Sequence, residues 1–264
     1  NRSSDDSVAR LEGLSVAAGT LKIIRNDRNL GFSAACNIGA LASAADYLLF
    51  FNPDATLDSQ ALSRMLAVFD DDERVGMVGG MLCNPDGSEQ PGGRRTFPTP
   101  GRAFFRAFGL SWLQRVSPRL FPDFLLHQSP LPAKAVAVEA ISGACMLVKR
   151  AAIDDVGLWD EAYFLHCEDL DWCMRFSQKG WRVMFVPGAR VLHVWGGCSR
   201  SRPIFVEWHK HHGMLRFYRK FYRQRYPGLL WWLVVAGVWL RFTMLAGYYS
   251  VRHGCRKLGM ARAG

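Results

Sequence analysis

The sequence predicts an α/β fold with a mostly parallel, mixed sheet flanked by helices, followed by a basic and apolar helical tail that associates with a membrane. Two observations predict the sheet: short apolar runs alternate with helical patterns over the first 200 residues, and turn residues bound the runs. The tail is predicted from an apolar segment at 229–249 that follows a basic, aromatic stretch. We therefore divide the chain into a domain over 1–206 and a tail over 207–264.

The first half of the chain alternates strand and helix. Three short apolar runs, each ending at an asparagine, are predicted strands: 20–26, 46–52 and 75–84. Between them, an alanine-rich pattern predicts a helix over 33–45, and an amphipathic pattern predicts another over 59–71. Asp58 or Ser59 is the expected cap of the second helix.

The second half begins with an excursion at 84–101, where glycine and proline break the alternation. Aromatic residues mixed with arginine predict an amphipathic helix over 102–128, and strand character returns over 136–150. The stretch 168–180 has acids first, bases later and a final glycine, which indicates a helix. Two last strands are predicted at 181–187 and 190–196.

Charge separates the domain from the tail. Residues 200–264 hold 13 basic residues against the single acid Glu207, whereas the first 199 hold 20 basic and 22 acidic residues. The tail therefore has an anionic partner: a membrane surface, nucleic acid or phosphate. The seven cysteines show no Cys-x-x-Cys spacing, which favours reduced, buried thiols in a cytosolic protein.

The apolar segment 229–249 predicts membrane attachment, by either of two modes. A bilayer core needs about 20 apolar residues, which this segment supplies apart from Arg241 and Thr243. Arg241 would cost about 2.5–3.5 kcal/mol at the middle of a bilayer, while the tryptophans and flanking bases equally suit a helix that lies in the interface. The sequence does not distinguish a helix that spans the bilayer from one that lies in its interface.

Asn52-Pro53-Asp54 ends the apolar run Tyr47–Phe51. Pro53 cannot donate to a sheet, so the strand ends there and Asp54 lies just beyond it. In open α/β sheets, ligands bind outside the carboxyl ends of strands. Asp54 is therefore either a turn residue or a ligand of a bound group.

Two further clusters have both a structural and a functional interpretation. The stretch 29–39 is a glycine turn that opens a helix, which suits a phosphate or a plain strand–helix connection. Glu168, Asp169 and Asp171 lie in the first turn of a predicted helix, where they either complement its dipole or supply a general base.

His193 and the pair Arg94-Arg95 are equally ambiguous from sequence alone. His193 at a strand end is a packed residue or, if it lies near Asp54, part of a Mn²⁺ or Mg²⁺ site together with diphosphate oxygens. Arg94 and Arg95 are a solvated charge pair or a clamp for phosphate.

Four stretches resemble the family 2 glycosyltransferases of GT-A fold, and in particular their rhamnosyltransferase-like branch. They are "IRNDRNLGFSAACNIGA", "YLLFFNPDATL", "ISGACMLVKRAAIDDVGLWDEAYFLHCEDLDWCMRFSQKGWRV" and "VLHVWGGCS", within a match over about 1–225. The resemblance implies inverting transfer of a sugar from a nucleoside diphosphate donor. The branch suggests rhamnose from dTDP-rhamnose, moved to a lipid-linked (polyprenyl) or cell-surface glycan acceptor.

The resemblance also implies roles for individual residues. Asn52-Pro53-Asp54 takes the place of the family's Asp-x-Asp motif, with Asn52 departing from the usual first Asp. Asp54 would hold a divalent metal, Mg²⁺ or Mn²⁺, and His193 would complete the metal site. Asp169, in the pair Glu168-Asp169, matches the catalytic base. By the same resemblance, the loop that lines the donor nucleotide includes Asn29, Gly31 and Asn37, and Gly143 falls in the segment that approaches the sugar and acceptor.

The chain departs from the family at its start. It begins at Asn1, where members have already completed a strand, a helix and a second strand ending in Asp-Asn-x-Ser. We therefore expect a truncated form of an active enzyme, an expectation that fails if the fragment folds stably and binds nucleotide sugar at micromolar strength.

Localisation and two competing functions follow from the tail. Its bases and apolar segment suit an enzyme at the cytoplasmic face of a bacterial inner membrane. One alternative is a non-catalytic membrane-bound scaffold or degenerate transferase. The other is a nucleic-acid module built from aromatic and basic residues, which we rank lower, with no nucleic acid expected as partner, because 229–249 is too apolar for a solvated arm.

Overall fold

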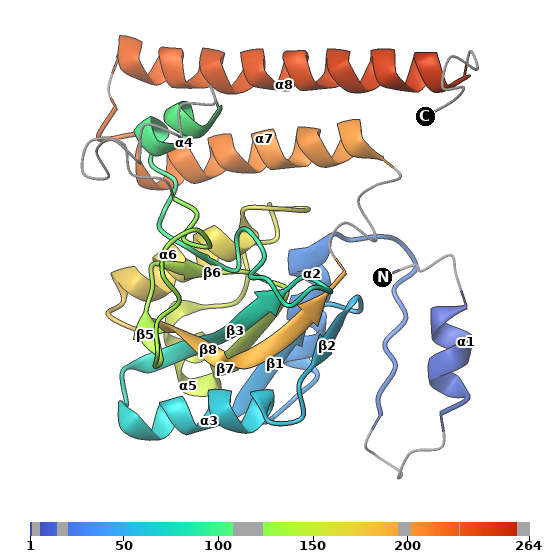
Figure 1. Ribbon diagram of the computed structural model, residues 1–264, viewed down its shortest axis with the longest axis vertical. Helices are drawn as coiled ribbons and strands as arrows, with labels where there is room; N and C mark the ends of the chain where they lie inside the picture. The colour runs from blue at the N-terminus through green and yellow to red at the C-terminus, as the bar shows by residue number, and fades with distance from the viewer. Residues whose placement is uncertain (2–5, 15–20, 108–123, 195–201, 227, 258–264) are drawn as a thin grey trace.

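The computed structural model describes residues 1, 6–14, 21–107, 124–194, 202–226 and 228–257, and a mixed sheet lies at its centre (Figure 1). The strands are β1 (Tyr47–Phe51), β2 (Ala55–Leu57), β3 (Val75–Cys83), β4 (Arg94–Arg95), β5 (Val136–Ala137), β6 (Ala140–Ile141), β7 (Cys145–Lys149) and β8 (Arg182–His193). The helices are α1 (Ser7–Glu12), α2 (Phe32–Leu41), α3 (Ala61–Asp71), α4 (Pro100–Ala107), α5 (Arg150–Val156), α6 (Glu168–Gln178), α7 (Pro203–Phe221) and α8 (Leu229–Lys257).

The main sheet has the order β1-β7-β3-β8-β2, with β5 also paired to β8. It is mixed, as predicted, but its parallel part is smaller than predicted: only β3 and β8 run parallel, and the other described pairings are antiparallel. The reason is the position of β7, which lies between β1 and β3. Cys145 opens β7 opposite Phe51, the last residue of β1, so β7 runs back from the edge where β1 ends.

Several predicted elements differ from those observed. Residues 21–26 of the predicted first strand belong to no strand, and Leu21 and Ile24 are each 39% exposed. β2 lies between Asp54 and the predicted helix 59–71, which is observed as α3 with Gln60 at its N-cap position instead of Asp58 or Ser59. Part of the predicted helix 102–128 is α4, and residues 108–123 lie outside the described residues.

β8 joins two predicted strands into one. Its register against β3 shifts between Gly80 and Met81, so Pro187, Gly188 and Ala189 have no partner on that strand. A Cβ on Gly80 would lie 2.5 Å from the carbonyl oxygen of Ala189, so only glycine permits this close approach. Because β8 continues past the bulge, His193 is its last residue; 195 and 196 of the prediction lie outside the described residues.

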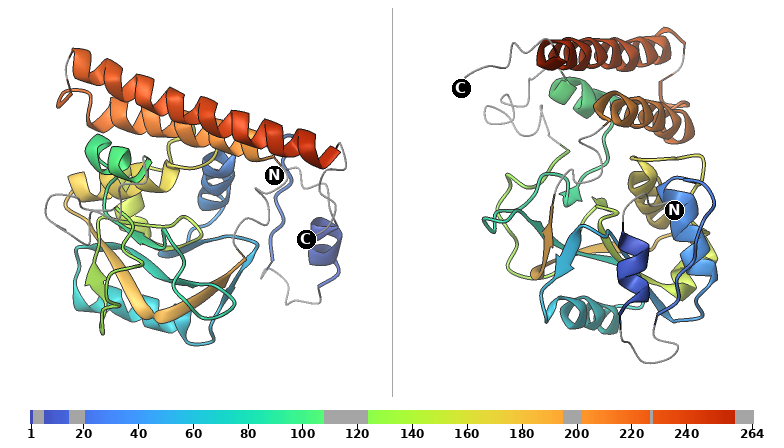
Figure 2. Two further views of the ribbon diagram at one scale, coloured as in Figure 1. Left: turned by 45° about the horizontal axis from the view of Figure 1, so that its top comes forward. Right: turned by 90° about the vertical axis from the view of Figure 1, so that its right-hand side faces the viewer.

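Helices cover both faces of the sheet (Figures 1 and 2). Each face has its own core of buried side chains. On one face, α3 places Met65, Val68 and Phe69 against the sheet, at the spacing of a single helix stripe. On the other, α6 buries Trp172, whose ring lies 4.1 Å from that of Trp159 between centroids. Removing such a side chain costs about 3–5 kcal/mol in typical cores.

The tail forms two helices that lie side by side above the sheet, with α7 between α8 and the domain (Figures 1 and 2). The predicted boundary after residue 206 falls inside α7, whose Phe217 and Tyr218 are buried in the same core as Trp172. α7 is therefore packed against the domain. In the described residues, one helix is long and apolar enough to cross a membrane, at Leu229–His253.

The described cysteines are free. Cys83, Cys145, Cys167 and Cys173 are buried and Cys36 is half-buried, in agreement with reduced thiols. Burial raises the pKa of each of these thiols for which a shift is resolved, for example that of Cys145 to about 11.

Candidate active site

Asp54 and His193 lie side by side at one edge of the sheet. β2 begins immediately after Asp54 and pairs with the end of β8, so Ala55 is opposite His193. The backbone N–H of Val194 donates to the carbonyl of Asp54 over 2.9 Å. In consequence, His193 Nε2 lies 3.3 Å from Asp54 Oδ1. Sheet register alone thus brings together two residues that are far apart in the sequence.

Gln90 fixes the orientation and tautomer of His193. Its amide nitrogen donates to the carbonyl of His193 over 2.6 Å, which places the amide oxygen 2.9 Å from His193 Nδ1. Because that oxygen can only accept, Nδ1 carries the proton in the neutral ring, and the lone pair of Nε2 points toward Asp54. Gln90 is buried, 3% exposed, so the arrangement is held within the protein.

This pair fits a divalent metal completed by a substrate. A neutral imidazole whose other nitrogen is held by a second group is the usual form of a histidine ligand, and a carboxylate oxygen is a ligand for Mg²⁺ and Mn²⁺. No cluster of three or more metal-binding side chains occurs in the described ranges. Mg²⁺ typically takes one or two protein carboxylates and completes its shell with phosphate oxygens and water.

Asp169 lies at the start of α6 and accepts three hydrogen bonds. Its Oδ2 accepts from Arg95 Nη2 over 2.6 Å and from the backbone N–H of Gly143 over 3.2 Å, while Oδ1 accepts from the N–H of Leu170. Asp169 and Arg95 are each 13% exposed at the side chain. Each oxygen of the carboxylate can accept further hydrogen bonds.

Residues Gly143 and Ala144 connect the two groups. Gly143 bonds Asp169, and the carbonyl of the next residue, Ala144, accepts from the N–H of Asn52 over 3.0 Å. Asn52 is two residues before Asp54. A single short backbone segment therefore contacts both the carboxylate at α6 and the end of β1.

The turn before α6 has an unusual backbone. His166 and Cys167 both have positive φ, 67° and 70°, which is costly for residues other than glycine. Gly213 of α7 packs against this turn: a Cβ there would lie 2.9 Å from the carbonyl oxygen of His166. Cys167 Sγ also lies 3.7 Å from the carbonyl oxygen of Lys210. α7 thus holds the turn that delivers Asp169.

Glu168 differs from its neighbour Asp169. It is 7% exposed, and its Oε2 has no hydrogen-bond partner among the described residues. Burial, followed by the negative charge of Asp169, raises the pKa of Glu168 to about 8. The raised pKa favours the neutral carboxyl of Glu168, which is the form that donates a proton, and its predicted role in catalysis stays a prediction.

The comparisons with known proteins give the family. The sequence family described as "Glycosyltransferase like family 2" matches residues 1–208. The chain belongs to this family.

Several of the relatives that the chain matches are named as rhamnosyltransferases. The chain is 29% identical over 184 residues to the N-acetylglucosaminyl-diphospho-decaprenol L-rhamnosyltransferase of Mycobacterium tuberculosis, covering 66% of this chain and 58% of that one. It is 31% identical over 94 residues to the rhamnosyltransferase WbbL of Escherichia coli, covering 31% and 36%. It is 24% identical to the dTDP-rhamnosyl transferase RfbF of Shigella flexneri, covering 73% and 58%. The match therefore spans 58% of the length of the M. tuberculosis and S. flexneri relatives and 36% of WbbL.

Among solved structures, GalNAc-T7 with UDP, GalNAc and Mn²⁺ aligns at a TM-score of 0.49 and 16% identity, covering 74% of this chain and 36% of that one.

In this family 2 glycosyltransferase domain, the predicted donor loop has a defined internal structure. Asn29 Oδ1 accepts from the N–H of Gly31 and from Asn1 Nδ2, both over 3.0 Å. Gly31 has a φ of 89°, and a Cβ there would lie 2.7 Å from the carbonyl oxygen of Phe164. The loop therefore contacts the segment that leads to α6 at Phe164, and its role in donor binding stays a prediction.

Asn37 lies away from any open surface. It is 4% exposed, its amide donates to Trp159 O and Glu161 Oε1, and its oxygen accepts from the N–H of Trp159. These bonds occupy the polar group within the protein, so Asn37 fixes α2 against the 159–161 segment instead of lining the nucleotide as predicted.

Arg94 and Arg95 are not the solvated pair that was one alternative. Arg94 is 5% exposed and forms a two-pronged ion pair with Glu89, at 2.8 and 3.0 Å. Arg95 bonds Asp169 and the carbonyl of Ile141. Arg94 thus has a structural role, whereas Arg95 is part of the candidate site.

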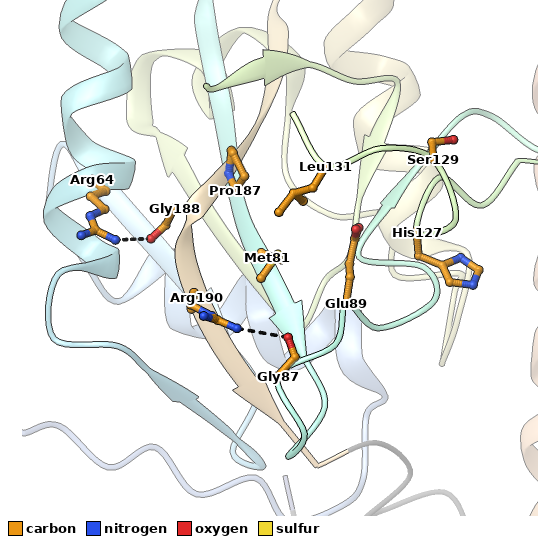
Figure 3. A pocket seen from close by; sticks show the side chains of 10 residues that line it. All are labelled: Arg64, Met81, Gly87, Glu89, His127, Ser129, Leu131, Pro187, Gly188 and Arg190. Carbon is orange, nitrogen blue, oxygen red and sulfur yellow. Dashed lines mark hydrogen bonds between the residues drawn. The ribbon is translucent and has the colours of Figure 1, made fainter. Parts of the chain in front are cut away.

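A cavity of about 530 Å³ lies elsewhere on the domain (Figure 3). It is lined by the β8 bulge, the end of β3 and the 127–131 segment, with Arg64 and Arg190 bonded to Gly188 and Gly87. None of the site residues predicted from the sequence lines it.

Sequence reasoning missed Gln90 and the contact of Gly213 with the 166–167 turn. Gln90 stands in the glycine- and proline-rich excursion, where no periodic pattern marks it. Gly213 is a glycine inside a helix, which lowers helix propensity, and that local cost was the one available signal of a close approach.

Proposed function

We propose that this chain carries the catalytic domain of an inverting glycosyltransferase, which moves a sugar from a nucleoside diphosphate donor to an acceptor hydroxyl. One observation carries the proposal: the Asp54–His193 pair and the Asp169 carboxylate are linked through the Gly143-Ala144 backbone at the end of β1. That arrangement supplies the two things that inversion needs, a place for the leaving diphosphate and a base for the incoming hydroxyl.

Asp169 is the proposed base. The acceptor oxygen forms a bond to the anomeric carbon while the bond from that carbon to the diphosphate oxygen breaks, and Asp169 takes the hydroxyl proton. Arg95 and the N–H of Gly143 hold Oδ2 in place. The second oxygen, Oδ1, has one N–H donor and keeps a lone pair for the proton.

Asp54 and His193 would hold Mg²⁺ or Mn²⁺ against the donor diphosphate. When bound, the ion supplies charge neutralisation on the departing nucleoside diphosphate. His193 contributes the lone pair of Nε2, which Gln90 keeps directed toward Asp54. Asn52, at the first position of the motif, contributes its backbone N–H to Ala144 and thereby sets the position of Asp54.

The relatives support a rhamnosyl donor and a lipid-linked acceptor. Three of them are named as rhamnosyltransferases, one with dTDP-rhamnose and one with a decaprenyl diphosphate acceptor in its name. We propose dTDP-rhamnose as donor and a polyprenyl-linked glycan as acceptor, at the cytoplasmic face of a bacterial inner membrane. The basic tail and the apolar α8 support the membrane as partner.

The test is transfer and donor hydrolysis by the full-length protein. dTDP-rhamnose and UDP-sugars are offered with Mn²⁺ or Mg²⁺ to the wild type, Asp54→Ala and Asp169→Asn. Asp169→Asn is expected to lower kcat by about 10²–10⁴-fold, because the amide cannot take the proton, while metal affinity stays near that of the wild type. Asp54→Ala is expected to weaken metal binding as well as turnover.

Asp86→Ala, in the exposed turn after β3, is the matched control and should behave as wild type. Absence of turnover with every donor, in a folded and membrane-bound protein, would support the scaffold instead. Unchanged kcat in Asp169→Asn would show that another group is the base.

A further inference from the structure

One face of α8 is apolar along nearly its whole length and faces away from the protein. Its large exposed side chains are between 48% and 75% exposed: Leu229, Leu230, Trp232, Leu233, Leu240, Met244, Tyr248 and Val251. The other exposed residues between 229 and 251 are Ala236, Thr243, Gly247 and Ser250, so this face carries no charge. We call it the α8 outer face. An apolar stripe of this length on a surface marks an interaction site.

The one charge within the apolar segment points the other way. Arg241 Nη1 lies 3.0 Å from His211 Nε2 and 3.9 Å from the Glu207 carboxylate, both on α7. The same side of α8 places Trp239 and Phe242 against Trp208, at 5.2 and 5.5 Å between ring centroids. Arg241 and the aromatic side chains on the inward face of α8 therefore have their partners on α7.

α7 cannot follow α8 into a bilayer. It carries Lys220, which pairs with Asp160 and Asp171 of the domain at 3.0 and 2.7 Å, and Arg216, which pairs with Asp160 at 2.9 Å. If α8 stood across a membrane, α7 beside it would take these charges and part of the domain into hydrocarbon. With α8 lying flat, α7 and its ion pairs stay in water.

The positive charge of the tail favours an anionic lipid surface as the partner of the α8 outer face. No Asp or Glu follows Glu207 in the sequence. Basic residues lie near both ends of the helical hairpin formed by α7 and α8, including Arg219, Arg223, Arg225 and Arg252. Bases beside an apolar stripe are the composition of helices that lie in anionic membrane interfaces. A second copy of the chain would bring the same positive charge toward itself.

We propose that α8 lies in the plane of an anionic bilayer surface, with its outer face immersed and α7 between it and the domain. This decides between the two modes of attachment that the sequence leaves open. The proposal rests on the membrane part of the proposed function and does not depend on sugar transfer. A failure of the membrane-binding tests can therefore be told apart from a failure of the transfer assay.

The test is the immersion depth along α8. A nitroxide amino acid is placed at Leu233, Leu240, Met244 or Val251 of the full chain, which is bound to vesicles of phosphatidylethanolamine and phosphatidylglycerol. Power-saturation EPR then gives four depths. A flat helix places all four within about 5 Å of one level. A spanning helix separates the first from the last by about 27 Å along the membrane normal, and that profile would overturn the proposal.

Vesicle binding supplies an independent test. Leu240→Glu with Met244→Glu is expected to lower partitioning into these vesicles at least ten-fold, while Leu41→Glu, at a leucine 72% exposed on α2, leaves it unchanged. Circular dichroism and the thermal transition confirm that each variant folds. Undiminished binding of the folded double variant refutes the proposal, as does a stable dimer in solution that covers the outer face and binds no vesicles.

Discussion

The two sides of the candidate site are held in different ways. Asp54 and His193 are neighbours because β2 pairs with the end of β8, so backbone register positions them and Gln90 orients the ring. Asp169 depends instead on the left-handed turn at 166–167 and on α7, which presses Gly213 against it. The Asp54–His193 side, which is the proposed metal side, therefore depends on the sheet, whereas the Asp169 side, which is the proposed base side, depends on contacts with α7.

The largest effect should come from disturbing the base side through α7. Gly213→Ala places a Cβ 2.9 Å from the carbonyl oxygen of His166, so the turn or the helix must move. We expect kcat to fall by about 10²-fold, because displacement of a catalytic group by about 1 Å has that effect. Metal affinity, measured by titration calorimetry with Mn²⁺ and dTDP, should stay unchanged.

Gly237→Ala in α8 is the matched control, since a Cβ there meets nothing within 4 Å. If Gly213→Ala weakens metal binding as much as it lowers kcat, the two sides are not independently held.

A smaller effect, confined to the metal side, is expected from Gln90→Leu. The change leaves His193 without its Nδ1 partner, so both the tautomer and the ring orientation are released. Loss of such a partner typically costs about 10–100-fold in metal affinity. Mn²⁺ EPR titration in the presence of dTDP measures it, and the exposed Gln178→Leu serves as control. An unaltered dissociation constant would mean that sheet register alone is sufficient.

The smallest effect concerns stability at the base side, through Glu168. Below pH 4.5, the ordinary pKa of a glutamate, the carboxyl is protonated in both the folded and the unfolded chain. Between 4.5 and about 8 only the unfolded chain ionises it, so folding stability falls as pH rises through this range. Glu168→Gln removes the ionisation and should raise Tm relative to wild type, progressively from pH 5 to about pH 8.

Thermal melts of both proteins across that range decide the matter. A difference in Tm that does not grow with pH would show that the Glu168 carboxyl is not held neutral in the folded protein.

Sequence reasoning anticipated the end of β1 and the start of α6 better than the contacts that hold the residues there. Pro53 ends β1 and leaves Asp54 at the sheet edge, and the charge pattern of 168–178 gives α6, because both signals are local. That His193 lies beside Asp54 was a condition that sequence could state but not verify, since it depends on the pairing of β2 with β8. β2 has three residues, too few for a periodic pattern.

The errors have physical causes of the same kind. Asn37 matches a donor-loop position by its place in the chain, yet its amide is used to bind Trp159 and Glu161, which lie far along the sequence. Residues 21–26 have the composition of a strand, but strand formation requires a free sheet edge, which composition cannot reveal. The 207–264 tail looks separate by charge, while its buried Phe217 joins the core.

The position of α7 determines how far an acceptor must extend from the membrane surface. With α8 on the lipid surface, α7 forms a layer about 10 Å thick, one helix diameter, between the bilayer and the domain that holds Asp169. An acceptor anchored in the same membrane must therefore project its reactive hydroxyl across that layer. The enzyme would then select acceptors by how far they extend from the lipid as well as by the sugar they present. The thickness of α7 would set the minimum extension.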